Sequence, residues 1–186
     1  FGSTDNPAAY AMVYKSKPFY IDELDIEIFE IMPNPLDAHI IIPGYRTLWK
    51  KAHERSPEKP KPFVSLHSKS MVIDESIGLV GSFNFDPRSA HINTELGVVV
   101  RDKNFAKKLK MDIDLDRSPK NAWVSARQQP TNSTLREMNE YVEDMFSHLP
   151  VDPWPYRTHT CFQLKAGFTP VPRYHPKFYD HYENVG

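Results

Sequence analysis

The distribution of apolar and polar residues along the chain predicts a mixture of helices and strands. Apolar segments at residues 71–73 and 79–80 flank the turn-forming residues 74–78, and this order is typical of a β-hairpin. The alternation of apolar and acidic residues over 24–31 indicates a half-buried edge strand. Two further strands are expected at 39–42 and 96–100, the second of them buried.

Four helices are predicted from residue spacing and from terminal signals. Ser3 and its polar neighbours precede Pro7, which is typical of a helix start, so a helix is expected over 8–17. Residues 102–115 place apolar side chains at four-residue steps along one face. The other two predicted helices are 45–55, which has a basic face, and 134–149, which is amphipathic.

Prolines are concentrated in two parts of the chain and predict irregular structure there. The sequence contains 17 prolines, which is above their usual share of about 5%. The group at 57–62 indicates an exposed loop, and the group at 150–176 indicates an irregular tail. The tail is also rich in aromatic residues, which suits either a belt at a membrane interface or a strap over the domain or a partner subunit. We favour the strap.

The overall charge gives no general attraction to nucleic acid or to anionic membranes. The chain has 23 basic and 24 acidic residues, so its formal net charge is −1. Positive charge is nevertheless concentrated in residues 46–61. This cluster suits a surface that holds phospholipid head groups or another polyanion, although a solvated loop is the interpretation that we favour.

Length and composition bear on the class of protein. A chain of 186 residues suits one domain with a substantial core, and its single cysteine, Cys161, excludes an internal disulfide bond. The sequence contains no apolar run of about 20 residues and begins at Phe1 within a polar segment. We therefore expect a fragment of a longer protein that is soluble by itself, and a membrane anchor of the parent would not be visible here.

The densest group of polar residues lies around the predicted hairpin. His67 and Lys69 are two positions apart, so they point to the same face of a strand. Ser82 and Asn84 have the same spacing after the second apolar segment. The hairpin is therefore expected to bring an imidazole, an ammonium, a hydroxyl and a carboxamide together at one end of a sheet.

This set of side chains suits an anion better than a metal ion. It contains one histidine and no cysteine, so a structural zinc site is not expected, and the adjacent lysine disfavours any cation. Lys69 supplies positive charge, whereas Ser82 and Asn84 supply neutral hydrogen-bond donors. A phosphoryl group, whose negative charge is spread over its oxygens, fits this set best.

His67 is then placed to act as a nucleophile on phosphorus. A histidine nucleophile needs one ring nitrogen free while an acceptor holds the other as N–H. Glu95 is a candidate for that acceptor if the strand that follows it lies beside the first. Asp74 lies in the turn, where we interpret it as an architectural hydrogen-bond acceptor and not as a base.

The spacing of these residues resembles the signature of the phospholipase D superfamily. The segment HSKSMVID at 67–74 has the histidine, lysine and aspartate of that signature, and GSFN follows six residues later at 81–84. The continuation FNFDPRSAHINTELGVVV at 83–100 resembles most closely the branch of bacterial cardiolipin synthases and related phosphatidyltransferases. The resemblance covers roughly residues 3–123, and the segment at about 33–62 is interpreted as an insertion.

The resemblance implies an α/β fold, namely a phospholipase D-like sandwich with a mixed central β-sheet flanked by helices on both faces. Residues 1–149 would form a catalytic half-domain, and residues 150–186 would form a C-terminal tail. The family needs no metal ion or other cofactor. Two copies of the motif, from the two halves of one chain or from two subunits, form one active site, so the expected partner is an N-terminal half with a second motif or a second copy of this chain.

The resemblance also implies roles for individual residues. His67 would be the nucleophile or the general acid, and Glu95 would orient it. The candidate catalytic residues are His67, Lys69, Asp74, Asn84 and Glu95, and the candidate phosphate-binding residues are Lys69, Ser82 and Asn84.

The expected function is phosphatidyl transfer, or hydrolysis of phospholipid phosphodiesters, through a phosphohistidine intermediate. The parent protein is expected to be associated with the bacterial inner membrane or cell envelope. Two alternatives stay open: a phosphodiesterase that acts on nucleic acid, for which the sequence has no strong signal, and a catalytically silent half-domain that serves as a scaffold. The head group and the acceptor alcohol are left open as well.

Overall fold

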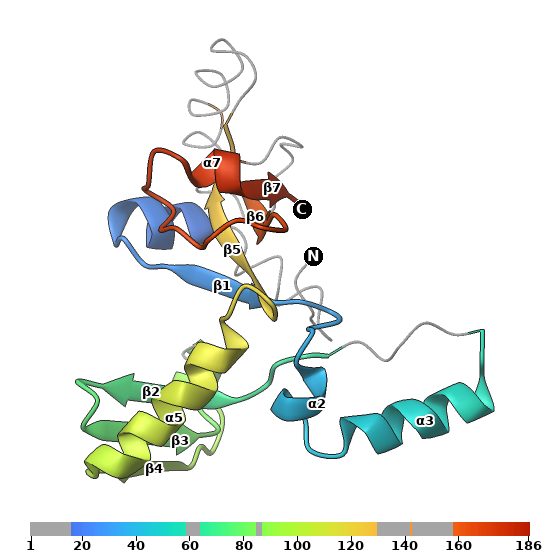
Figure 1. The fold of residues 1–186 in the computed structure, drawn as a ribbon. Coiled ribbons are helices and arrows are strands. Elements are labelled where there is room, and N and C mark those ends of the chain that lie inside the picture. The colour runs from blue at the N-terminus through green and yellow to red at the C-terminus, as the bar shows by residue number, and fades with distance from the viewer. Residues whose placement is uncertain (1–15, 59–63, 85–86, 130–141, 143–157) are drawn as a thin grey trace. The chain divides into compact units, whose positions relative to one another are not determined.

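The chain folds into helices and antiparallel strands that form two compact units. The computed structural model describes residues 16–58, 64–84, 87–129, 142 and 158–186 (Figure 1). One unit consists of Phe1–Pro33 and Ala122–Gly186, and the other consists of Asn34–Asn121. Helices and strands occur together in the described residues, so the predicted α/β class is confirmed at this level. The predicted helices 8–17 and 134–149 lie almost entirely outside the described residues.

The unit Asn34–Asn121 is built on a three-stranded antiparallel sheet. Its strands, in spatial order, are β2 (Lys69–Ile73), β3 (Ile77–Gly81) and β4 (Gly97–Val100). The first two strands form the predicted hairpin, in which Lys69 pairs with Gly81. The turn between them has positive φ at both Asp74 and Glu75, as a type I′ hairpin turn requires.

Helix α5 (Lys103–Asp116) packs against one face of this sheet (Figure 1). It begins where the sequence predicts, because the Asp102 carboxylate accepts a hydrogen bond from the Phe105 N–H at 2.7 Å and caps the first turn. A Cβ atom at Gly78 would lie 2.5 Å from the Phe105 ring. The missing side chain at position 78 therefore allows the helix to pack directly on β3.

The other face of the sheet, opposite α5, is only partly covered. Because side chains alternate along each strand, this face presents Lys69, Met71, Leu79 and Val99. The prediction of a buried strand at 96–100 is wrong in one respect, since Val98 and Val99 of β4 are both exposed. β4 is the last strand in the order of its sheet, so only one neighbouring strand covers it.

Three shorter helices complete this unit: α2 (Ala38–Ile41), α3 (Tyr45–Arg55) and α4 (Pro87–His91). The bounds of α3 are those predicted from the sequence, whereas the strand predicted at 39–42 is wrong, because α2 occupies that segment. A short apolar run does not distinguish a strand from a helical turn. Here the Ile41 N–H donates to the Asp37 carbonyl at 3.0 Å, and the buried Asn121 accepts from the Asp37 N–H at 3.0 Å, which fixes the start of the turn.

The second sheet belongs to the unit formed by Phe1–Pro33 and Ala122–Gly186. Its four antiparallel strands, in spatial order, are β1 (Ile28–Ile31), β5 (Ala122–Arg127), β6 (His159–Leu164) and β7 (Tyr182–Asn184). The π-helix η1 (Phe19–Glu23) and the turn at Asp25, which has φ +51°, precede β1. The strand predicted over 24–31 is therefore confirmed only in its second half. All strand pairs in the described residues are antiparallel, in contrast to the single mixed sheet that the sequence predicts.

The hydrophobic core of this unit is formed mainly by the segment predicted to be an irregular tail. Phe162 in β6, Phe178 in helix α7 (Phe178–His181) and Tyr182 in β7 are buried, and the rings of the last two stack with centroids 4.4 Å apart. The prediction of irregular structure over 150–176 is therefore wrong for β6, whereas the described residues 165–176 contain turns and no helix or strand, as predicted. The described aromatic residues of this core do not form an exposed belt, because their rings pack on one another.

A buried ion pair joins the residue Lys17, which precedes η1, to strand β1 of the same sheet. The Lys17 ammonium, which is almost fully buried, pairs with the Glu30 carboxylate. The Ser125 hydroxyl donates to Glu30 at 3.2 Å and lies 3.8 Å from the Cys161 sulfur. Burial and the nearby Glu30 carboxylate raise the pKa of the Cys161 thiol to about 11. The charges of this cluster are paired with each other, as buried charges in native proteins are.

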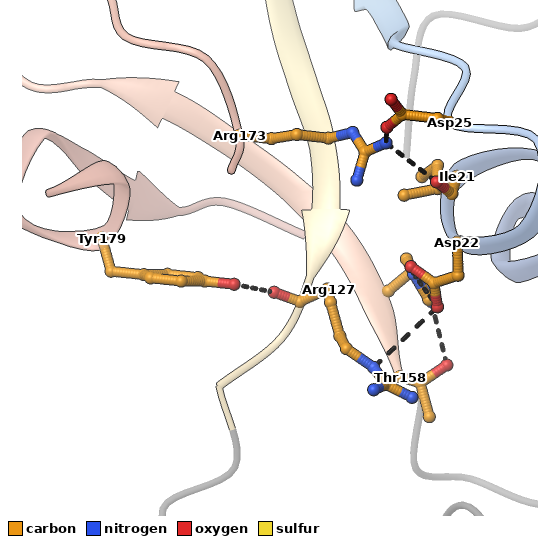
Figure 2. A network of polar contacts seen from close by, with 8 residues as sticks. Ile21, Asp22, Asp25, Arg127, Thr158, Arg173 and Tyr179 are labelled. Atoms are coloured by element: carbon orange, nitrogen blue, oxygen red, sulfur yellow. Dashed lines mark hydrogen bonds and ion pairs between the residues drawn. The ribbon is translucent and has the colours of Figure 1, made fainter. Parts of the chain in front are cut away.

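A second polar network joins distant segments of the same unit (Figure 2). The Arg173 guanidinium donates to the Ile21 carbonyl at 2.8 Å and forms an ion pair with Asp25. The Tyr179 hydroxyl donates to the Arg127 carbonyl at 2.8 Å. The C-terminal segment is thus tied both to η1 and to β5.

His159 occupies the buried end of this network. It is 1% exposed, and its Nε2 lies 3.2 Å from the Asp22 carboxylate, while its Nδ1 lies 3.0 Å from the Thr158 hydroxyl. Burial lowers the pKa of His159 below its ordinary value, Asp22 opposes this change, and Arg127 and Lys17 add to it. The folded chain therefore binds a proton at His159 less readily than the unfolded chain does.

The burial of His159 predicts a pH-dependent stability of this unit. The unfolded chain takes up a proton at this histidine below about pH 6.5, whereas the folded chain takes it up only at a lower pH. The free energy of unfolding should therefore fall as the pH drops through that value, as measured by urea unfolding at a series of pH values. In His159→Gln, which keeps polar contacts but does not titrate, the fall should be smaller. An identical pH dependence in the two proteins would contradict this assignment.

The contact between Gly78 and α5 predicts a second effect on stability. Gly78→Ala should lower the free energy of unfolding by about 1–3 kcal/mol, because the new methyl group overlaps the Phe105 ring. Gly97→Ala is the matched control, since no atom lies within 4 Å of the corresponding Cβ position. Urea unfolding measures both changes, and equal effects of the two substitutions would show that α5 does not pack on β3 as described.

Candidate functional site

His67 and Lys69 lie together at the start of β2. The Lys69 ammonium lies 3.0 Å from Nδ1 of His67 and donates to the His67 carbonyl at 2.8 Å. His67 is exposed and Lys69 is half-buried, so a ligand can reach both groups from solvent. The spacing of two residues along an extended segment places both side chains on one face, as predicted.

The contact between these residues determines which nitrogen of the imidazole ring has the proton. An ammonium group can only donate a hydrogen bond, so Nδ1 of His67 must act as the acceptor. The proton of the neutral ring then lies on Nε2. In this arrangement His67 presents a donor to the solvent, and its free lone pair is covered by Lys69.

Ser82 and Glu95 form a second group at the same end of the sheet. The Ser82 hydroxyl donates to the Glu95 carboxylate and accepts from the Leu96 N–H at 3.0 Å. The Ser82 N–H donates to the Leu96 carbonyl at 2.9 Å, which extends the pairing of β3 and β4 by one step. A Cβ atom at Gly81 would lie 2.6 Å from that carbonyl oxygen, so the close approach of the two strands requires glycine.

Two further residues of this group do not belong to the predicted set. The buried Ser89 in α4 accepts from the Asn84 N–H at 3.3 Å and also hydrogen-bonds to Glu95. The Asn93 carboxamide donates to Glu95 at 3.2 Å. Both lie within the dense polar segment that the sequence shows, but only the return of the chain through α4 makes them neighbours of Asn84 and Glu95.

These contacts keep Glu95 ionised. The hydrogen bond from Ser82 has the largest effect and lowers the pKa of Glu95, with smaller contributions from Ser89, Asn93 and the charge of Lys69. Lys69 is thus close enough to act on Glu95 electrostatically. This interaction connects the pair His67 and Lys69 to the group around Ser82.

The structure brings most, but not all, of the predicted residues together. His67, Lys69, Ser82, Asn84 and Glu95 lie at the end of the sheet where β2 begins and β3 ends. Asp74 is exposed and lies in the turn at the opposite end of the hairpin. It follows Lys69 by five residues of extended chain, which corresponds to about 16 Å between their backbones. Among the described hydrogen bonds, Glu95 binds Ser82, Ser89 and Asn93, and the predicted contact of Glu95 with His67 is not one of them.

Two properties of the described residues bear on cofactors and membranes. No group of three or more histidine, cysteine, aspartate or glutamate side chains within these residues is arranged to hold a metal ion. In the same part of the chain, none of the helices has both the length and the apolar character needed to cross a bilayer.

The comparison with protein families finds a match that covers the site. Residues 37–116 match the family model described as "Cardiolipin synthase, PLD-like domain". This segment contains every predicted site residue. The resemblance to the phospholipase D superfamily, and to its cardiolipin synthase branch, is thereby confirmed over residues 37–116.

Individual relatives match over shorter segments. Cardiolipin synthase A of Buchnera aphidicola is 35% identical over 86 residues, which is 45% of this chain and 17% of the relative. Cardiolipin synthase C of Escherichia coli is 50% identical over 42 residues, which is 23% of this chain and 9% of the relative. An uncharacterized protein of Helicobacter pylori is 49% identical over 49 residues, or 26% of this chain and 10% of the relative. The matches therefore span less than a fifth of each of these relatives, and no solved structure matches the chain.

The hydrogen bonds to Glu95 predict how its ionisation responds to mutation. Ser82→Ala removes the largest of them, so the pKa of Glu95 should rise towards its ordinary value. A carboxylate with a lowered pKa stabilises the fold above its ordinary pKa, and this contribution is lost as the pH falls through the lowered value. Titration of the Glu95 carboxyl carbon by NMR measures the change.

Ser76→Ala provides the control, because the Ser76 hydroxyl lies in the hairpin turn and bonds only weakly to the Ile73 carbonyl, at 3.4 Å. It should leave the Glu95 titration unchanged. If Ser82→Ala also leaves it unchanged, then the Ser82 hydroxyl does not determine the charge state of Glu95 in solution.

Proposed function

We propose that residues 64–100 form one half of an active site that transfers or hydrolyses phosphatidyl groups. This proposal depends on the contact between Lys69 and His67. It places a positive charge directly beside a nucleophilic imidazole, where both can be reached from solvent. The family match and the cardiolipin synthase relatives support phospholipid phosphodiesters as the substrate class. A phospholipase D-like sandwich fold is part of this proposal.

Lys69 would link phosphate binding to activation of His67. A nonbridging phosphate oxygen is a better partner for the ammonium than the neutral imidazole, because it is charged. When Lys69 moves to the phosphate, Nδ1 of His67 becomes free, and the ring can present an unprotonated nitrogen to phosphorus after a proton shift. Ser82 and Asn84 would donate hydrogen bonds to the remaining phosphate oxygens. The negative charge of Glu95 would balance part of the positive charge of Lys69.

The reaction would proceed in two displacements. A ring nitrogen of His67 forms a bond to phosphorus, the bond from phosphorus to the leaving alcohol breaks, and the alcohol takes a proton from a general acid on the second motif. The same group then removes a proton from an acceptor alcohol or water, which attacks phosphorus and releases His67. If the second motif provides the nucleophile instead, His67 would act as the general acid in its protonated, imidazolium form.

The second motif would come from another part of the parent protein or from a second copy of this chain. The matched segments span only 9% to 17% of the three relatives described above, so the full proteins contain much more than this unit. The isolated chain would therefore bind phosphate but turn over substrate only when the second motif is present. We propose association with the bacterial membrane or cell envelope, where the substrate lies.

Substitution of the site residues tests this function. In the assembled enzyme, His67→Ala should abolish turnover of phosphatidylglycerol, and Lys69→Ala or Asn84→Ala should lower it about 10²–10³-fold through loss of a phosphate-binding group. Lys107→Ala, which removes an exposed charge from α5, is the control and should retain activity. Normal activity of His67→Ala would favour a silent scaffold, and cleavage of single-stranded DNA without action on phospholipid would favour the nucleic-acid alternative.

A binding measurement on the chain alone avoids the need for the second motif. Addition of a short-chain phosphatidylglycerol below its micelle concentration should shift the amide NMR signals of Lys69, Ser82 and Asn84. The shifts should disappear in Lys69→Met. Shifts that are scattered over the surface, or that persist in that variant, would contradict phosphate binding at this site.

A further inference from the structure

Helix α3 presents an apolar stripe to solvent, although it lies in a folded unit. None of its residues is buried, and Leu48 and Trp49 are 56% and 38% exposed. Figure 1 shows α3 apart from the β2–β3–β4 sheet and from α5. Tyr45, Leu48, Trp49 and Ala52 have the spacing i, i+3, i+4, i+7, which aligns them along one face of a helix.

The charged residues of α3 are arranged around this stripe in a definite order. With about 100° between successive residues, Arg46 and His53 border the stripe on the side of Trp49. Lys51 and Arg55 border it on the side of Leu48, and Glu54 lies near the opposite face. Four basic residues and one acidic residue give the helix a net charge of +3 (4 − 1, with histidine neutral).

This arrangement matches the physical requirements of a helix at the surface of an anionic bilayer. Such helices have aromatic and aliphatic residues on one face and lysine and arginine on the other. Basic side chains at the border extend their charged ends to lipid head groups while their methylene stems stay with the apolar face. Trp49 stacks on His53 with ring centroids 5.4 Å apart, which puts the amphipathic indole ring at the border where interfacial tryptophans lie.

The length of α3 also favours an external surface. An isolated helix shorter than about 12–15 residues is marginal in water, and most helical stability in proteins comes from packing of the apolar face. α3 has 11 residues, begins after Gly44 without a side-chain cap, and buries none of its residues in the described structure. A lipid interface would supply apolar packing for the exposed side chains of Leu48 and Trp49.

We propose that α3 is the element that docks this unit on anionic phospholipid bilayers, with Leu48 and Trp49 inserted at the interface. The proposal rests on the proposed function for the choice of a lipid surface, since it brings the site around His67 to its substrate. Charge complementarity favours an anionic bilayer over a protein partner or a second copy of α3. A neutral protein surface would not require three arginine and lysine residues along the borders of the stripe, and a second α3 would bring like charges together.

Flotation of the full chain with lipid vesicles tests the proposal without any turnover. The chain should bind vesicles of phosphatidylcholine mixed with phosphatidylglycerol, and should bind vesicles of phosphatidylcholine alone much more weakly. Lys51→Gln/Arg55→Gln should lower the affinity about 25-fold, since each basic residue near an anionic surface contributes about fivefold. Leu48→Ser/Trp49→Ser should lower it about tenfold or more through loss of apolar contact.

The matched control is Lys103→Gln/Lys107→Gln, which removes two exposed charges from α5 and should bind almost normally. His67→Ala should also bind normally, so a failure of the catalytic proposal and a failure of this one are distinguishable. Equal losses in the α3 and α5 variants would overturn the proposal, because they would indicate a general effect of charge.

Two other occupants of the stripe give different results. If Leu48→Ser/Trp49→Ser lowers the free energy of unfolding in urea and leaves vesicle binding intact, α3 packs on its own chain. If the chain forms dimers in sedimentation that this variant abolishes, again with vesicle binding intact, the stripe binds a second copy. Either result would overturn the proposal, whereas blue-shifted fluorescence of Trp49 on anionic vesicles, absent in Trp49→Phe, would support it.

Discussion

At the end of the β2–β3–β4 sheet, the backbones of β3 and β4 come so close that a side chain at position 81 has no room, because its Cβ would lie 2.6 Å from the Leu96 carbonyl oxygen. This approach lets Ser82 bond to Leu96 through both its amide and its hydroxyl. The hydroxyl is then oriented towards Glu95, and the charge of Glu95 acts on Lys69. The positions of Ser82 and Glu95 in the site therefore depend on the packing of two backbones.

Local periodicity predicts the elements that form through local contacts. The hairpin of β2 and β3, the helix α3 and the capped helix α5 follow from residue spacing and from single signals such as Asp102. The predictions for residues 39–42 and 159–164 are wrong, because the structure of these segments depends on distant partners. Asn121 fixes the turn of α2 from 84 residues away, and β6 forms only because it pairs with β5 and β7.

The same distinction applies to the site. The spacing of two residues between His67 and Lys69 predicts their contact, because alternation along an extended segment is a local property. The link between Ser82 and Glu95 spans 13 residues and depends on the return of the chain through α4, which also brings in Ser89. Glu95 is expected to accept from His67 if its strand lies beside the first, whereas in the described hydrogen bonds it accepts from Ser82. Charge is also unevenly distributed along the chain. The whole chain has a net charge of −1 and α3 has +3, so the remainder has −4 (−1 − 3). This asymmetry would orient the protein with α3 towards an anionic surface.

The burial of Cys161 has a practical consequence for work on this protein. It is the single cysteine of the chain, it is 3% exposed, and its thiol has a pKa of about 11, so very little thiolate is present near neutral pH. Because the thiolate is the reactive species, maleimide reagents should spare this position in the folded protein. A cysteine introduced on an exposed helix could then be labelled selectively with a spin probe or fluorophore, while the natural thiol stays in place.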